Sequence, residues 1–192
     1  MFSLSKKGVI RIIFLYHGTI DRYAADIVAH GIDLSKSKPH LDFGPGFYTT
    51  PDFQFALETA RSRANRYNSF RPEQKPVIPS VLTFECDDAL FQSLNQKTFD
   101  KPDSSWGRFI LANRCESHLV HECFDHNIDA KYDIVFGPTA DGKGTLTPIV
   151  EKINTDASFI EQADYNSFVP ALHKTWGRQI SFHTMRSLFI CQ

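Results

Sequence analysis

Two short segments near the start of the chain combine residue types that suit ligand binding. The first ends an apolar run with His17 followed directly by Gly18, so an imidazole lies beside unobstructed backbone at the end of a strand. The second places two glycines, Gly44 and Gly46, just ahead of Tyr48. These glycines let the backbone approach a flat ligand, and Tyr48 presents a ring to it. Together the two segments predict a clamp for a flat ligand, which we interpret as NAD.

The composition is that of a packed globular protein with no bias toward polyanions. The chain has 192 residues, 42% of them hydrophobic, including 17 Phe, and a net charge of −1. We expect one domain over residues 1–192, no membrane segment, and no nucleic acid partner, because backbone binding to nucleic acids needs clustered Lys and Arg. The four cysteines lack paired CxxC spacing, and we expect reduced thiols in a cytoplasmic protein or one delivered into a target cell.

Strands and helices interleave along the chain without regular alternation. Strands are expected at 9–17, 47–49, 81–85, 132–136 and 179–183, and helices at 21–30, 51–67, 103–114 and 164–175. This order predicts an α+β fold, not a doubly wound sheet. No GxGxxG turn follows a strand, so NAD would not bind through a dinucleotide-binding fingerprint.

Several motifs in this order resemble one known superfamily. They are Leu15-Tyr16-His17-Gly18, Asp42-Phe43-Gly44 through Tyr48-Thr49-Thr50, Trp106 with Phe109-Ile110 and Asn113-Arg114, Tyr132 through Pro138 with Ala140-Asp141, and Gln179 through Phe182 with Thr184. The layout is similar to that of ADP-ribosyltransferases of the H-Y-E type, the fold of diphtheria toxin and poly-ADP-ribose polymerase. It resembles more closely, over residues 12–189, a small bacterial family of ADP-ribosyltransferase-like domains of unknown function. The resemblance implies a split β-sheet core surrounded by helices.

The resemblance also implies roles for the clamp residues. The backbone N–H and C=O of Gly18 would pair with the nicotinamide carboxamide, where a missing Cβ gives room. His17 would donate to a ribose hydroxyl, and Tyr48 would stack on the nicotinamide. The remaining residues expected to contact NAD are Thr19, Gly46, Phe47, Thr50 and Arg114.

The third position of the H-Y-E layout departs from the pattern. Active members carry a glutamate on the late strand, whereas this chain has Gln179, an amide without negative charge. Asp42, just before the glycine loop, is our preferred substitute for the missing carboxylate, and a role as a cap for the loop is the alternative. The expected catalytic set is therefore His17, Tyr48, Gln179 and Asp42.

Two further groups of residues have both a functional and a structural interpretation. Arg114 could pair with the NAD pyrophosphate or with Asp133, and a buried structural ion pair is the structural interpretation. The segment from Cys115 to His126 carries two cysteines and three histidines at spacings that suit zinc, but it lacks the paired spacing of a zinc finger. We interpret it as a solvated helix and expect no metal.

The function implied by the resemblance is mono-ADP-ribosyl transfer from NAD to a side chain of an unidentified target protein. A bacterial toxin or secreted effector is the expected biological class. The alternative is a catalytically weak module that binds NAD or ADP-ribose without transfer, which Gln179 in place of glutamate would favour. A third hypothesis, that the glycine loop is only structural, predicts no NAD binding.

Overall fold

The computed structural model describes residues 11–140, 143–172 and 177–190. The strands are β1 (Ile12–Ile20), β2 (Phe47–Thr49), β3 (Pro79–Asp87), β4 (Gln96–Thr98), β5 (Ile134–Pro138) and β6 (Arg178–Phe182). The helices are α1 (Asp21–His30), the 3₁₀ turn η1 (Leu34–Lys36), α2 (Phe53–Phe70), α3 (Asp88–Gln92), α4 (Ser104–Arg114), α5 (His118–Cys123), α6 (Lys143–Thr155), α7 (Phe159–Gln162), α8 (Tyr165–Leu172) and α9 (Met185–Leu188). Within these ranges no helix combines the length and apolar character needed to cross a membrane.

The strands form two separate sheets, which makes the architecture α+β. In one sheet β1 pairs antiparallel with β3 along its whole length. The other has the order β2-β6-β5-β4, antiparallel except for the parallel pair β4 and β5. A backbone bridge between Tyr16 and Thr50 links β1 to the end of β2. The two sheets therefore meet where the first predicted segment faces the second.

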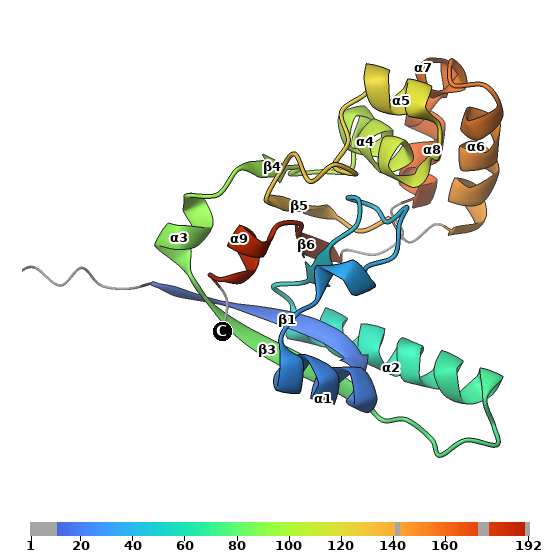
Figure 1. The fold of residues 1–192 in the computed structure, drawn as a ribbon. Coiled ribbons are helices and arrows are strands. Elements are labelled where there is room, and N and C mark those ends of the chain that lie inside the picture. The colour runs from blue at the N-terminus through green and yellow to red at the C-terminus, as the bar shows by residue number, and fades with distance from the viewer. Residues whose placement is uncertain (1–10, 141–142, 173–176, 191–192) are drawn as a thin grey trace, which may run out of the picture.

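Helices cover the two sheets in different ways (Figure 1). The helices α1 and α2 lie beside the β1-β3 pair, whereas α4 to α8 gather at the far side of the larger sheet. A core that includes Leu15, Ile134, Ile180 and Phe182 fills the space between the sheets. The larger core surrounds α4, whose residues 109–113 are all buried. Burial on nearly all sides explains why α4 is apolar around most of its circumference.

The expected helices and strands are largely present, with shifted ends. Helix α1 matches the predicted range, begins at Asp21 and ends before Gly31, whose φ of +81° suits glycine. Asp52 and Asp103 cap α2 and α4 through their carboxylates, so α2 begins at Phe53, two residues later than expected. Strand β1 runs three residues past His17, while residues 9 and 10 lie outside the described ranges. The expected helix at 164–175 is α8 up to Leu172, and residues 173–175 are likewise outside them.

The expectation that all four thiols are reduced is wrong, because Cys86 is in a disulfide. Cys86, fully buried in β3, is disulfide-bonded, whereas Cys115 and Cys123 carry free thiols. The N–H of Asp87 donates to the Ile190 carbonyl at 3.1 Å, so the C-terminal end of the described chain lies beside Cys86.

Candidate functional site

The end of β1 directs backbone groups toward the junction of the two sheets. The Tyr16 N–H donates to the Thr50 carbonyl at 2.8 Å, and the Thr50 N–H donates back at 2.9 Å. Because alternate residues of a strand direct their N–H and C=O groups to the same edge, Gly18 faces this junction and not β3. The Gly18 carbonyl accepts a hydrogen bond from the Arg63 guanidinium at 2.8 Å. A ligand that used this carbonyl would have to share it with Arg63 or displace Arg63.

The missing side chain of Gly18 serves helix packing. A Cβ at this position would lie 2.0 Å from the carbonyl oxygen of Ala56 and 3.0 Å from the backbone nitrogen of Ala60. The prediction that the missing Cβ gives room for a ligand is therefore wrong, because α2 fills that space. Only glycine allows α2 to approach β1 so closely.

His17 is buried, and its protonation state is set by its surroundings. Its Nδ1 lies 2.7 Å from the backbone carbonyl of Tyr48, and its ring stacks on Phe47 with the centroids 4.4 Å apart. Burial, aided by the charge of Arg63, lowers the pKa of His17 from 6.5 to about 4. The neutral imidazole therefore donates from Nδ1 to Tyr48, and Nε2 is an acceptor. At neutral pH His17 could accept a hydrogen bond from a ribose hydroxyl, which reverses the predicted direction.

Tyr48 holds the glycine loop through its hydroxyl group. The hydroxyl donates to the Gly44 carbonyl at 2.6 Å and accepts the Phe43 N–H at 3.0 Å. Burial, and then the charge of Asp42, raise the pKa of Tyr48 well above its usual value, so the phenol stays protonated. Its ring stacks on Phe43 at 6.4 Å. Since side chains alternate along β2, this ring lies on the opposite face of the strand from Phe47 and the His17 ring, so the imidazole and the phenol do not form one clamp.

Asp42 accepts hydrogen bonds from three different parts of the chain. One carboxylate oxygen accepts from the guanidinium of Arg114, and the other accepts from the Ala140 N–H at 3.1 Å and the Gln179 side-chain amide at 2.9 Å. The carboxylate side chain is only 10% exposed. Asp42 therefore joins the glycine loop to α4, to the end of β5 and to β6. Both carboxylate oxygens of Asp42 accept hydrogen bonds from within the protein, so Asp42 does not present a free carboxylate for catalysis.

The contact with Asp42 fixes the orientation of the Gln179 amide. Because Nε2 donates to the carboxylate, the carbonyl oxygen Oε1 is the amide atom left to accept a hydrogen bond. In the antiparallel pair of β2 and β6, Thr49 lies opposite Ile180. The next residue after β2, Thr50, therefore lies opposite Gln179. Gln179 thus lies next to the junction that Thr50 makes with β1. The structure therefore brings Gln179, Asp42 and Tyr48 together near this junction.

Arg114 and its neighbour Asn113 hold the site from α4. The expected partner Asp133 instead accepts hydrogen bonds from the Thr184 hydroxyl at 2.6 Å and the Asn95 N–H at 3.1 Å. Arg114 forms an ion pair with Asp42, a partner that the sequence did not single out. Asn113 is fully buried, and its side-chain oxygen accepts the N–H of Asn127 at 2.8 Å.

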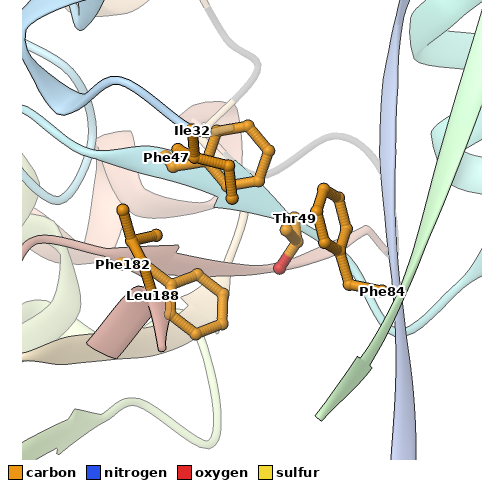
Figure 2. Close-up of a pocket in the computed structure, with 6 residues that line it drawn as sticks. All are labelled: Ile32, Phe47, Thr49, Phe84, Phe182 and Leu188. Atoms are coloured by element: carbon orange, nitrogen blue, oxygen red, sulfur yellow. The ribbon is translucent and has the colours of Figure 1, made fainter. Parts of the chain in front are cut away.

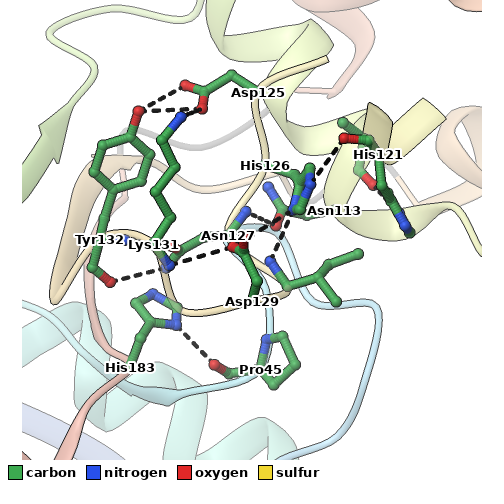
Figure 3. Close-up of polar contacts among 12 residues, drawn as sticks. Pro45, Asn113, His121, Asp125, His126, Asn127, Asp129, Lys131, Tyr132 and His183 are labelled. Carbon is green, nitrogen blue, oxygen red and sulfur yellow. Dashed lines mark hydrogen bonds and ion pairs between the residues drawn. The ribbon is translucent and has the colours of Figure 1, made fainter. Parts of the chain in front are cut away.

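A second histidine, which the sequence did not single out, anchors the glycine loop. Figure 3 shows the His183 ring next to Pro45, with Nδ1 2.7 Å from the Pro45 carbonyl. Nε2 lies 2.7 Å from the hydroxyl of the fully buried Ser181, which donates to it. A Cβ on Gly46 would lie 2.7 Å from Nδ1 of His183, so this glycine is also needed for packing. The alternation of Ser181 and His183 at the end of a predicted strand was the signal that could have revealed the pair.

The two predicted threonine contacts, Thr19 and Thr50, belong to the strands that form the junction or directly follow them. The Thr50 hydroxyl accepts the Asp52 N–H at 3.1 Å, at the start of α2. Thr19 is buried in β1, on the same strand face as His17. These positions leave Nε2 of His17 and Oε1 of Gln179 as the side-chain acceptors most directly available to a ligand.

The histidine-rich segment uses its imidazoles for backbone hydrogen bonds. His121 Nε2 lies 3.2 Å from the Ala112 carbonyl and 3.1 Å from the Cys115 carbonyl, at the end of α4. His126 Nε2 lies 3.1 Å from the His121 carbonyl (Figure 3). Among the described residues, no group of three or more His, Cys, Asp or Glu is arranged to hold a metal ion. His121 thus satisfies carbonyls that the helix end leaves free.

A small apolar pocket lies between the two sheets, next to the junction. Figure 2 shows it lined by Ile32, Phe47, Thr49, Phe84, Phe182 and Leu188. Its volume of about 10 Å³ is near the minimum needed for one water molecule. A nicotinamide ring would fit there only if the sheets moved apart.

Comparison with known proteins defines the family. Residues 13–191 match the family model described as "Protein of unknown function (DUF3990)". The chain belongs to the DUF3990 family. No curated protein matches the chain, and no solved structure matches it. The match spans both segments of this DUF3990 chain and every residue of the Asp42 cluster.

The buried histidines of this DUF3990 chain make its stability depend on pH. Burial lowers the pKa of His183 from 6.5 to about 4. Between these pH values the unfolded chain takes up a proton that the folded chain does not, so stability falls as the pH drops through this window. The loss for His183 alone is about 3 kcal/mol.

We expect His183→Asn, which keeps a donor at the Nδ1 position but cannot titrate, to show a smaller loss of stability than wild type between pH 6.5 and 4. Urea denaturation across this range measures both profiles. If the free energy of unfolding fell by the same amount in the variant and in wild type over this pH range, His183 would not be the cause of the loss.

Proposed function

We propose that this chain is an NAD-dependent mono-ADP-ribosyltransferase that modifies a side chain of a target protein. The observation that carries the proposal is the junction of the sheets. There the bridge from Tyr16 to Thr50 and the hydrogen bond from His17 to the Tyr48 carbonyl hold β1 against β2. The division into two sheets supports a split β-sheet core of the ADP-ribosyltransferase type. The motifs that resemble this superfamily lie at or around the junction.

The proposed reaction breaks the bond between nicotinamide and ribose, with its electron pair leaving on nicotinamide. A nucleophilic side chain of the target then bonds to the ribose carbon and loses its proton to solvent. The developing positive charge on the ribose is stabilised by oriented acceptors. Oε1 of Gln179 is such an acceptor, because Asp42 fixes the amide. Nε2 of His17 would accept from a second hydroxyl of the dinucleotide and hold it in place.

A second candidate function is a module that binds NAD or ADP-ribose without transferring it. The pairing of Asp42 favours this candidate, since both carboxylate oxygens accept hydrogen bonds within the protein. Gln179 has no negative charge of its own. In the Asp42 cluster, the Gln179 amide would then be the group that interacts with a ribose cation. A neutral amide stabilises a positive charge less than a carboxylate does.

One experiment separates these functions. Purified protein is incubated with NAD, and NAD binding by calorimetry, nicotinamide release, and labelling of lysate proteins from labelled NAD are measured. Binding with release and labelling supports the transferase. Binding without release supports the binding module, and absence of binding contradicts both proposals.

The variant His17→Asn tests the role of one ring nitrogen. Asparagine retains a donor near the Nδ1 position for the Tyr48 carbonyl and lacks an acceptor at Nε2. We expect affinity for NAD to fall about tenfold, as for the loss of one hydrogen bond from a buried ligand group. Arg66→Gln, on the exposed face of α2, is the matched control and should bind like wild type. Equal affinity of His17→Asn and wild type would exclude Nε2 from the site.

A further inference from the structure

A second cavity lies on the side of the core away from the junction. It has a volume of about 420 Å³ and lies between β4, the first two turns of α4 and the segment that follows α5. This volume falls within the range of small-molecule sites. The residues that line it are Lys97, Phe99, Ser104, Ser105, Arg108, Phe109, Cys123, Phe124 and Asp125. The cavity therefore combines aromatic rings, hydroxyls and charged groups.

Aromatic rings form the apolar part of this cavity. Phe99 and Phe109 are 6% and 2% exposed, and their ring centroids lie 5.0 Å apart. Both rings also contact Phe43, with centroids 6.2 Å away, and Phe43 stacks on Tyr48. The aromatic layer thus separates the cavity from the Asp42 cluster. Phe124 is partly exposed and offers a further apolar surface.

The charges at the cavity favour an anion. Lys97 and Arg108 line it together with one carboxylate, that of Asp125. Asp125 is engaged by Lys97 at 2.8 Å, by Lys131 at 2.7 Å and by the Tyr132 hydroxyl at 3.0 Å, part of which Figure 3 shows. These contacts lower the pKa of Asp125 and hold its charge in place.

Arg108 is the cation available to a ligand. Its guanidinium carbon lies 5.9 Å from the centroid of the Phe124 ring and 5.2 Å from that of Tyr165. Among the described residues, no carboxylate lies within ion-pair distance of it. A guanidinium that contacts two rings, hydrogen-bonds the Tyr165 hydroxyl and has no acid partner among the described residues still has donors to bind a carboxylate or phosphate. The hydroxyls of Ser104 and Ser105 line the same cavity.

We propose that this cavity binds a small organic anion, a carboxylate or a phosphate carried on a flat apolar body. The oxyanion pairs with Arg108 and Lys97, and the apolar body lies against Phe109 and Phe124. The proposal does not depend on the NAD site, from which the Phe43 layer separates it. Loss of NAD binding would therefore leave this site intact.

Cys123 offers a local reporter for occupancy. Its thiol is exposed and lines the cavity, whereas burial raises the pKa of the Cys115 thiol to about 12. Cys86 is disulfide-bonded and cannot react as a thiol. Alkylation of Cys123 by iodoacetamide, followed by peptide mass spectrometry, therefore reports on this cavity separately from the other cysteines.

The test uses 2-naphthoate, 2-naphthyl phosphate and the neutral analogue 2-naphthol. We expect at least one of the two anions to bind by calorimetry and to slow alkylation of Cys123, and 2-naphthol to bind about tenfold or more weakly. The comparison of the two anions tells a carboxylate site from a phosphate site. Binding of 2-naphthol as tightly as both anions, or anion binding without protection of Cys123, would overturn the proposal, and so would absence of binding by both anions.

The variant Arg108→Gln examines the pairing with the anion. We expect about a tenfold loss of affinity for the bound anion and no change for 2-naphthol. The side chain is exposed, so the variant should fold, which circular dichroism verifies. Arg66→Gln, with the same charge change on α2, should bind the anion like wild type. Equal losses in the two variants would indicate a general charge effect and contradict a site at Arg108.

Discussion

Replacing Asp42 with asparagine is expected to lower the free energy of unfolding by about 3 kcal/mol, as for removal of one partner of a buried ion pair. The carboxylate is 10% exposed and Arg114 is 24% exposed, so the remaining cation would be poorly solvated. Asparagine also turns one acceptor into a donor. That donor would face the guanidinium, the Ala140 N–H or the Gln179 amide, all of which donate to Asp42. Urea denaturation at neutral pH measures the loss.

Two further variants separate the buried pair from a general effect of charge. Asp26→Asn removes a carboxylate from an exposed pair with Lys36 and should leave stability almost unchanged. In the double variant Asp42→Asn, Arg114→Gln the unpaired cation is gone, so stability should recover part of the loss. If Asp42→Asn cost no more than Asp26→Asn, the cluster would not hold the site together.

Local patterns in the sequence were sufficient for much of the fold. The aspartates before α2 and α4 mark helix starts because a carboxylate can satisfy free N–H groups within three residues. The short strand β4 and the helices α3, α6, α7 and α9 were not predicted. Strand β4 has three polar residues and exists because it pairs with β5, a contact between distant segments. Helix α6 contains Pro148, which weakens the helical signal.

The pairing of the predicted site residues could not be read from the sequence. Asp42 and Arg114 are 72 positions apart, and Asp42 and Gln179 are 137 apart. No local rule connects such residues, because the packing of α4 and β6 against the glycine loop determines which donors reach the carboxylate. The sequence also did not show which ring nitrogen of His17 donates and which accepts, since this depends on burial and on the position of the Tyr48 carbonyl.

The glycines of the predicted clamp have a physical cause within the protein. Both of its segments lie at one junction, but Gly18 and Gly46 are required by neighbours within the protein. The space that a Cβ would fill belongs to α2 at Gly18 and to His183 at Gly46. Packing within the protein is therefore sufficient to explain both glycines without a ligand.

The variant Gly18→Ala is expected to lower stability by about 3 kcal/mol or more, or to prevent folding. The new methyl group would lie 2.0 Å from the Ala56 carbonyl oxygen, which is backbone in the first turn of α2. No change of side-chain rotamer relieves this contact, so the helix must move away from β1. That movement would also disturb Arg63, which reaches the Gly18 carbonyl from α2. Thermal and urea denaturation of the purified variant measure the effect.

Two other glycines provide a graded comparison for this clash. At Gly107 the nearest atom to a new Cβ is a methyl carbon of Val169 at 2.8 Å, and this side chain can shift, so the loss should be smaller than at Gly18. At Gly144, in α6, a Cβ meets nothing within 4 Å, and alanine should raise stability by up to about 1 kcal/mol through helix propensity. The expected order of stability is therefore Gly144→Ala, wild type, Gly107→Ala and Gly18→Ala. If Gly18→Ala were as stable as Gly107→Ala, α2 would not be in rigid contact with β1, and packing would not explain this glycine.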